Sequence, residues 1–199
     1  MKYNIQKQDC KFCPKCGNNE LYFGASDQMQ NDNEILCRFL TGNGTDKYGR
    51  THGQILSMSD FKLETTHNYI QWLFPIDTPS KYADSIVLTD EMIASFKTDK
   101  EILANLKLAF ERMMRFYGFG RNDQGQLVIV ASRIKMRVTW LNRGNHNFLR
   151  LTRILKSLRL FGLSDLKRDL FAILHDLANE YTFLSEPYEY WKDAVIPKS

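Results

Sequence analysis

The chain has 199 residues, of which 43% are hydrophobic and 13% aromatic, so it can form one packed domain and does not belong to the disordered class. Its formal net charge is +4. No apolar run is long enough to span a bilayer, and the first residues lack the apolar core of a signal peptide, so we expect a soluble, cytoplasmic protein without membrane contacts.

Residues 1–36 are predicted to form a polar arm that contains three of the four cysteines. Cys13 and Cys16 are separated by two residues, a spacing at which two thiolates can hold one zinc ion. Cys10 and Cys37 are the nearest further thiols. The cysteines therefore predict a zinc knuckle, with free thiols on the arm as the alternative.

The main domain is expected over residues 37–184 and is predicted to be helical. It opens with a glycine- and asparagine-rich loop at 41–50. Ser59 or Asp60 is suited to cap the next helix, which Pro75 would end.

Two further helix starts follow. Thr89 precedes two acidic residues, which suit the positive end of a helix dipole. Thr98 and Glu101 fit a capping box, and Gly118 suits the position just after the helix that follows. This helix should bury an apolar stripe formed by Ile102, Leu106, Ala109, Met113 and Phe116.

Residues 126–141 allow two interpretations. The segment 127–130 favours a strand, whereas the residues after it fit a strand and a helix about equally. We favour a short strand followed by a helix.

The last part of the domain reads as two helices followed by a tail. Asn145 or Asn147 is suited to cap the first helix, which ends at Gly162, and Ser164 to cap the second. Residues 185–199 are aromatic and interrupted by proline, so we expect them to pack as an extended arm. The predicted fold class is mainly α: a single compact domain of about five to seven helices, with at most a small β element.

Positive charge is concentrated between residues 124 and 164, which contain no carboxylate. This segment carries +8, so the rest of the chain carries −4. Such a bias suits an anionic partner, whereas the alternative is neutralisation by acidic neighbours within the fold. The cations concerned are Arg133, Lys135, Arg137, Arg143, Arg150, Arg153, Lys156 and Arg159.

Four stretches resemble, in order and at compatible spacing, the opioid growth factor receptor conserved-domain family. They are FLTGNGTDKYGRT at 39–51, HNYIQWLFP at 67–75, AFERMMRFYG at 109–118 and NHNFLRLTRILKSL at 145–158. The resemblance covers about residues 37–177, and the cysteine-bearing arm lies outside it. It implies a binding domain: vertebrate members are associated with an enkephalin-type peptide, and the family offers no catalytic residues to carry over.

The signature stretch at 145–158 predicts a ligand-binding strip. If Asn145 opens a helix, then His146, Arg150 and Arg153 lie along one stripe of that helix. Arginine forks bind carboxylate or phosphate, and the free N–H groups of a helix start add to such a site. The alternative is that these groups pair within the fold.

A groove is expected between the helices at 60–74 and 145–160. His67 and Gln71, from the stretch at 67–75, are predicted to lie on the wall opposite this strip, and Arg137 and Arg143 to flank the groove. The expected function is recognition of an anionic or peptide ligand there. The first alternative is a nucleic-acid-associated regulatory protein that uses the same cations. The second is a small enzyme that uses His67 and His146 as acid and base, although no catalytic constellation stands out in the sequence.

Overall fold

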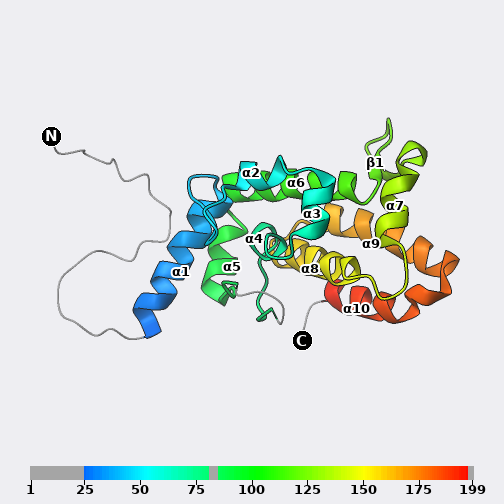
Figure 1. Ribbon diagram of the computed structural model, residues 1–199. Helices are drawn as coiled ribbons and strands as arrows, with labels where there is room; N and C mark the ends of the chain where they lie inside the picture. Colours follow the sequence, from blue (N-terminus) through cyan, green and yellow to red (C-terminus); the bar gives the residue numbers. More distant parts are fainter. Residues whose placement is uncertain (1–24, 81–84, 197–199) are drawn as a thin grey trace, which may run out of the picture.

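The computed structural model describes residues 25–80 and 85–196 of the chain (Figure 1). Helices dominate these residues, and the one sheet among them has two antiparallel strands. The elements are α1 (Ala25–Leu40), α2 (His52–Leu56), α3 (Asp60–Thr65), α4 (Ile70–Leu73), α5 (Asp90–Phe96), α6 (Lys100–Phe116), β1 (Phe119–Arg121), β2 (Leu127–Ile129), the 3-10 turn η1 (Ala131–Arg133), α7 (Ile134–Trp140), α8 (Asn147–Leu160), α9 (Ser164–Glu180), the 3-10 turn η2 (Thr182–Leu184) and α10 (Ser185–Val195). The predicted mainly α class is therefore confirmed.

Helix α6 forms one side of the core and follows the predicted pattern closely. Its predicted apolar stripe is buried, and Gly118 adopts a positive φ of 82° just after the helix. The cap differs from the prediction by one residue. Asp99 accepts hydrogen bonds from the backbone of Glu101 and Ile102, because its carboxylate competes better for these N–H groups than the Thr98 hydroxyl does.

The helix expected from Ser59 to Pro75 is broken into α3 and α4. Ser59 caps α3 as predicted, but Thr66 takes an extended conformation and ends it. The break leaves the last carbonyl groups of α3 without partners in their own helix. This correction matters because these carbonyls are bound by a side chain of α8, as described below.

The segment 126–141 adopts the favoured interpretation. Strands β1 and β2 pair in a register that places Phe119 opposite Ile129, and η1 and α7 follow them. Trp140, at the end of α7, is fully buried and donates from Nε1 to the carbonyl oxygen of Tyr117. The second strand therefore leads into a helix that closes over the end of α6.

The aromatic tail is a helix, not the extended arm that we expected. Residues 185–195 form α10, which packs against α8 and α9 (Figure 1). Pro187 stands in the first turn, where no hydrogen-bonded N–H is required of it. Trp191 is fully buried and donates from Nε1 to the carbonyl oxygen of Phe148, so the tail belongs to the core of the domain.

A chain of edge-to-face aromatic contacts connects α6 to α10 through α7 and α8. The ring of Trp140 lies 5.2 Å from that of Tyr117 and 6.4 Å from that of Phe148, and Phe148 lies 6.0 Å from Trp191. Edge-to-face pairs of aromatic rings stabilise a particular angle between the rings, in addition to the stabilisation that comes from burying their surface. The signature segment 145–158, which forms the first part of α8, is thereby fixed in the middle of the core.

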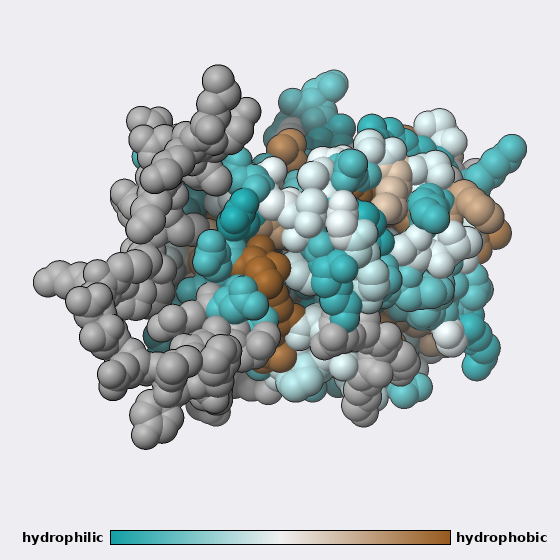
Figure 2. All heavy atoms as spheres, turned by 60° about the vertical axis from the view of Figure 1, so that its left-hand side comes forward, coloured by the Kyte–Doolittle hydropathy of each residue, from teal (hydrophilic) through white to brown (hydrophobic). Residues whose placement is uncertain are grey.

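Turning the molecule shows the face that carries α1 and α5. Hydrophilic side chains and side chains of intermediate hydropathy border a narrow hydrophobic strip on it (Figure 2). Within the described part of the chain, no helix combines the length and hydrophobicity that crossing a membrane requires.

Candidate functional site

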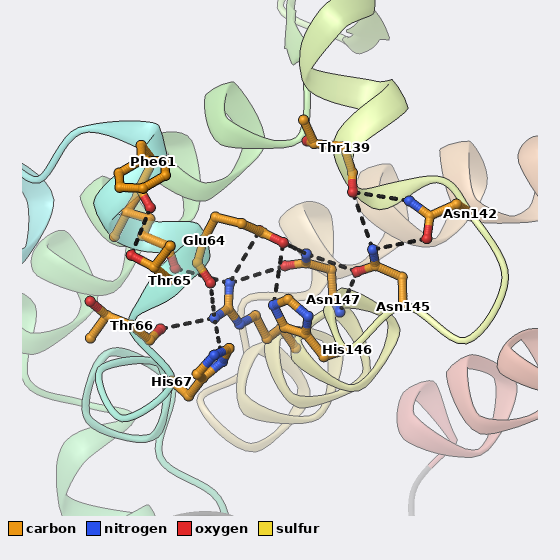
Figure 3. A network of polar contacts seen from close by, with 12 residues as sticks. Phe61, Glu64, Thr65, Thr66, His67, Thr139, Asn142, Asn145, His146 and Asn147 are labelled. Atoms are coloured by element: carbon orange, nitrogen blue, oxygen red, sulfur yellow. Dashed lines mark hydrogen bonds and ion pairs between the residues drawn. The ribbon is translucent and has the colours of Figure 1, made fainter.

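Two of the signature segments, 67–75 and 145–158, meet in space. His67 lies in the loop between α3 and α4, and His146 directly precedes α8 (Figure 3). Their imidazole rings are 5.0 Å apart, edge to face at 79°. His67 is exposed, and 40% of the His146 side chain is accessible. The fold thus forms one small polar surface from segments that are far apart in the sequence.

Arg150 lies beneath this surface and holds the loop that carries His67. Its guanidinium donates to the carbonyl oxygens of Leu63 at 3.1 Å, Glu64 at 3.3 Å and Thr66 at 2.9 Å. Nη2 is also 3.3 Å from Nδ1 of His67. The arginine therefore caps the broken end of α3 in place of the missing helix turn.

Asn147 connects this arginine to the carboxylate of Glu64. Its side chain is fully buried; Nδ2 donates to Oε2 of Glu64 at 3.0 Å, and Oδ1 accepts from Arg150 at 3.1 Å (Figure 3). Asn145 accepts from the backbone N–H of Asn147 just before the helix, but the residue at the N-cap is His146, which forms no side-chain cap hydrogen bond, so the predicted cap at Asn145 or Asn147 is wrong. The sequence predicts Asn147 only as a helix cap, and the signal that points to its wider role is the pair of asparagines on either side of His146.

The electrostatic environment favours a neutral His146. Burial lowers the pKa of its imidazole below the ordinary value, and the nearby charge of Arg150 acts in the same direction. Glu64, whose Oε1 lies 3.5 Å from Nε2, only partly opposes this. At neutral pH the ring can therefore both donate and accept a hydrogen bond.

Three residues expected to line an open groove are buried instead. Arg150 is 5% exposed, Arg153 9% and Gln71 6%. Arg153 donates from Nη1 to the carbonyl oxygen of Phe74, and burial lowers its pKa to about 10. The expectation of an outward-facing arginine strip is corrected, because carbonyls at the ends of α3 and α4 take up these guanidinium groups.

Two more cations of the basic segment also have partners within the chain. Lys156 pairs with Asp77 at 2.8 Å, and Arg159 donates to the carbonyl oxygen of Ala194. Arg143 remains exposed and Arg137 is partly exposed. Arg133 also donates to the carbonyl oxygen of Phe119, so five of the eight cations considered for a nucleic-acid partner have partners within the described residues.

The cysteine prediction falls mainly outside the described residues, where Cys10, Cys13 and Cys16 lie. Cys37 is 4% exposed on the inner face of α1. Among the residues that the structure describes, no three His, Cys, Asp or Glu side chains are arranged to hold a metal ion. Zinc binding by the arm stays a prediction.

Comparison with known proteins identifies the same region. Residues 55–189 match the opioid growth factor receptor conserved region. The opioid growth factor receptor of Rattus norvegicus is 44% identical over 102 residues, which are 51% of this chain and 18% of that protein. The opioid growth factor receptor-like protein 1 of Mus musculus is 39% identical over 122 residues, 61% of this chain and 26% of that protein.

The human opioid growth factor receptor is 40% identical over 109 residues, 54% of this chain and 16% of that protein. The match thus spans about a quarter or less of the length of these relatives, and no solved structure matches the chain. Because the conserved region covers most of the described residues, including both signature segments, the chain belongs to the opioid growth factor receptor conserved-region family.

Proposed function

We propose that this chain is an interaction domain that binds a peptide through the polar surface formed by Glu64, His67, Asn145 and His146. The observation that carries the proposal is the contact between the two imidazole rings at 5.0 Å. The two histidines come from different signature segments. His67 is exposed and His146 is partly exposed, with its Nε2 buried, whereas Arg150 and Asn147 beneath them are buried.

The chemistry of this surface suits a peptide backbone and its termini. A neutral imidazole can donate to a carbonyl group and accept from an N–H group, and a carboxylate such as that of Glu64 accepts from an amine. Phe61, one turn before Glu64 on α3, is 78% exposed and adds an apolar side chain to the helix that carries this carboxylate. Polar contacts bordered by one aromatic ring are typical of peptide recognition.

The buried network beneath the surface supports the same proposal. Arg150 and Asn147 fix the loop of His67 and the carboxylate of Glu64 before any ligand arrives. A preorganised site loses less conformational entropy on binding. In this proposal Arg150 positions the groups that contact the ligand and does not contact it directly.

The comparisons support a receptor function in general terms. The relatives in Rattus norvegicus and Homo sapiens are named opioid growth factor receptors, and residues 55–189 of this chain match the conserved region of that family. We therefore choose a short peptide of the enkephalin type as the probe.

Isothermal titration with an enkephalin pentapeptide tests the proposal. The double variant His67→Ala, His146→Ala should bind at least about tenfold more weakly, because it loses the ligand's hydrogen bonds. His175→Ala is a matched control, since this histidine is exposed on α9 and bonds to Tyr188. The proposal fails if the unmodified chain does not bind the peptide, or if the double variant, still folded, binds it equally well.

A second candidate function, acid–base catalysis, is favoured by the lowered pKa of His146 beside a second imidazole. A general base must be unprotonated at the working pH. Mass spectrometry of the same pentapeptide after prolonged incubation separates the two candidates: an intact peptide supports binding, whereas cleavage that is lost in the double variant supports an enzyme.

A further inference from the structure

A second surface lies away from the histidines, in a hollow of about 410 Å³ between the end of α2, one face of α6, strand β1 and the turn η1. Leu108, Arg112 and Arg115 line it from α6, where their spacing places them on one side of the helix. Leu56 and Arg133 border it from the neighbouring elements. The cavity therefore combines apolar walls with three guanidinium groups.

We propose that this hollow binds an acidic peptide segment of a partner protein, with carboxylate groups at Arg115 and Arg133 and an apolar side chain against Leu56 and Leu108. This site is separate from the proposed histidine surface. Its occupant is inferred from charge and from the mixed character of the walls.

The charges of the hollow are unbalanced. Glu111 also lines the hollow, but Arg121 neutralises it: Oε1 of Glu111 lies 2.7 Å from Nη2 of Arg121 and accepts a hydrogen bond of 2.8 Å from its Nε. Arg115 is exposed, and Arg133 donates to the carbonyl oxygen of Phe119. Neither of these two arginines forms an ion pair with a carboxylate among the described residues. The excess of positive charge favours an anionic occupant.

Arg112 adds an independent indication. It is 7% exposed and pairs with Asp60 at 2.8 Å, while its other nitrogens reach the carbonyl oxygens of Leu56 and Met58. Its Nη1 is buried and has no hydrogen-bond partner in the described part of the chain. A buried donor without a partner is costly, so this arginine at the wall of the hollow has hydrogen-bonding capacity that the described residues do not use.

The apolar walls favour a peptide over a nucleic acid. Leu108 is 57% exposed, and Leu56 is partly exposed beside it. A phosphate backbone gains nothing from such walls, whereas a peptide that alternates leucine with glutamate or aspartate fills both kinds of contact. Arginine forks are also well matched to carboxylates.

The test uses two capped hexapeptides, acetyl-Leu-Glu-Leu-Asp-Leu-Glu-amide and the amide-side-chain version acetyl-Leu-Gln-Leu-Asn-Leu-Gln-amide, titrated into the full chain and followed by backbone amide NMR shifts. The acidic peptide should bind at least about tenfold more tightly and should shift signals of α6 and β1. Equal binding of the two peptides would overturn the proposal.

The double variant Arg115→Gln, Arg133→Gln should weaken binding of the acidic peptide at least about tenfold. Lys135→Gln with Arg168→Gln is the matched control, because it removes two exposed cations outside the hollow and should leave binding within about threefold. Leu108→Gln, at an exposed position, should also weaken binding and does not depend on the hydrogen bond of Arg133.

Two results would overturn the acidic-peptide assignment. The first is an equal loss in the control variant, which would mean non-specific attraction between charges. The second is displacement of the peptide by low micromolar double-stranded DNA, which would assign the hollow to nucleic acid. Binding of the enkephalin pentapeptide should be unchanged in Arg115→Gln, Arg133→Gln, so the two proposals can fail separately.

Discussion

Arg150 of α8 donates a hydrogen bond of 3.1 Å to the carbonyl oxygen of Leu63, which lies 87 positions earlier, at the end of α3. The same guanidinium reaches Thr66 at 2.9 Å and lies over the ring of Tyr69 at 5.3 Å. One buried side chain thus fixes the angle between the two signature segments. The exposed histidines owe their contact to this buried arginine.

Replacing this arginine should destabilise the fold. We expect Arg150→Met to lower the free energy of unfolding by about 3 kcal/mol, because the carbonyls of Leu63 and Thr66 would lose their donor inside the protein. Urea unfolding followed by circular dichroism measures this change. Arg143→Met, at an exposed position, is the control and should stay within about 0.5 kcal/mol. A loss below about 1 kcal/mol for Arg150→Met would contradict the bracing role.

His52 should make the free energy of unfolding depend on pH. It is 3% exposed, and burial lowers its pKa from 6.5 to about 4, which a hydrogen bond to the backbone of Asn105 only partly opposes. The unfolded chain therefore binds the proton first, so stability is lost as the pH falls from about 6.5 to about 4, by about 3 kcal/mol in total. Melting temperatures across this range measure the effect.

The control for this prediction is His52→Phe, which keeps an aromatic ring beside Phe39, at a ring distance of 5.8 Å in the native chain. The variant should show a flatter dependence of melting temperature on pH than the unmodified chain. Parallel curves for the two proteins would mean that other groups cause the acid sensitivity.

The loop before α2 should depend on a buried ion pair. Asp46 is 3% exposed and pairs with Arg50 at 2.6 Å, and Arg50 also donates to Asn68 at 3.0 Å. Asp46→Ala leaves that guanidinium without its carboxylate and should cost about 3 kcal/mol in unfolding experiments. By contrast, Asp165→Ala breaks an exposed pair with Arg168 and should cost less than about 0.5 kcal/mol. Similar costs for the two substitutions would refute the distinction.

The C-terminal helix should be part of the cooperative core. Trp191 is fully buried, so Trp191→Ala should lower the free energy of unfolding by about 4 kcal/mol through the cavity and the lost hydrogen bond to Phe148. Tyr190 is 52% exposed, and Tyr190→Ala should have a much smaller effect. A tail that packed loosely would give similar, small effects for both.

Zinc binding is tested directly by elemental analysis of the natively purified chain. We expect about one zinc ion per chain, which Cys13→Ser with Cys16→Ser should remove because the metal needs thiolate ligands. The melting temperature of the helical domain should change little. Absence of zinc from the unmodified chain, or its retention by the double variant, would rule out the knuckle.

Several elements were predictable because their signals are local. The stripe of α6, the cap at Ser59, the strand before α7 and the positive φ of Gly118 follow from side-chain spacing and backbone sterics within a few residues. The break after Thr65 was not predictable in this way. It is stabilised by Arg150, whose contribution does not appear in any window around α3.

The tail and the basic segment were mispredicted for a related reason. Proline and aromatic residues at 185–199 suggested an extended arm, but burial of Trp191 against α8 favours a helix. Likewise, the absence of acids near Arg153 suggested a free charge, whereas its partner is a backbone carbonyl. Backbone acceptors occur at every residue, so charge counting along the sequence cannot reveal them.

The amino-acid sequence by itself determined the helical class, the family and the two segments that carry the signature, because periodicity, caps and ordered motifs are properties of neighbouring residues. Only the tertiary structure decided which of those residues face solvent. The ends of α3 and α4 present carbonyls that draw Arg150 and Arg153 inward, and this leaves His67 and His146 in contact at the surface.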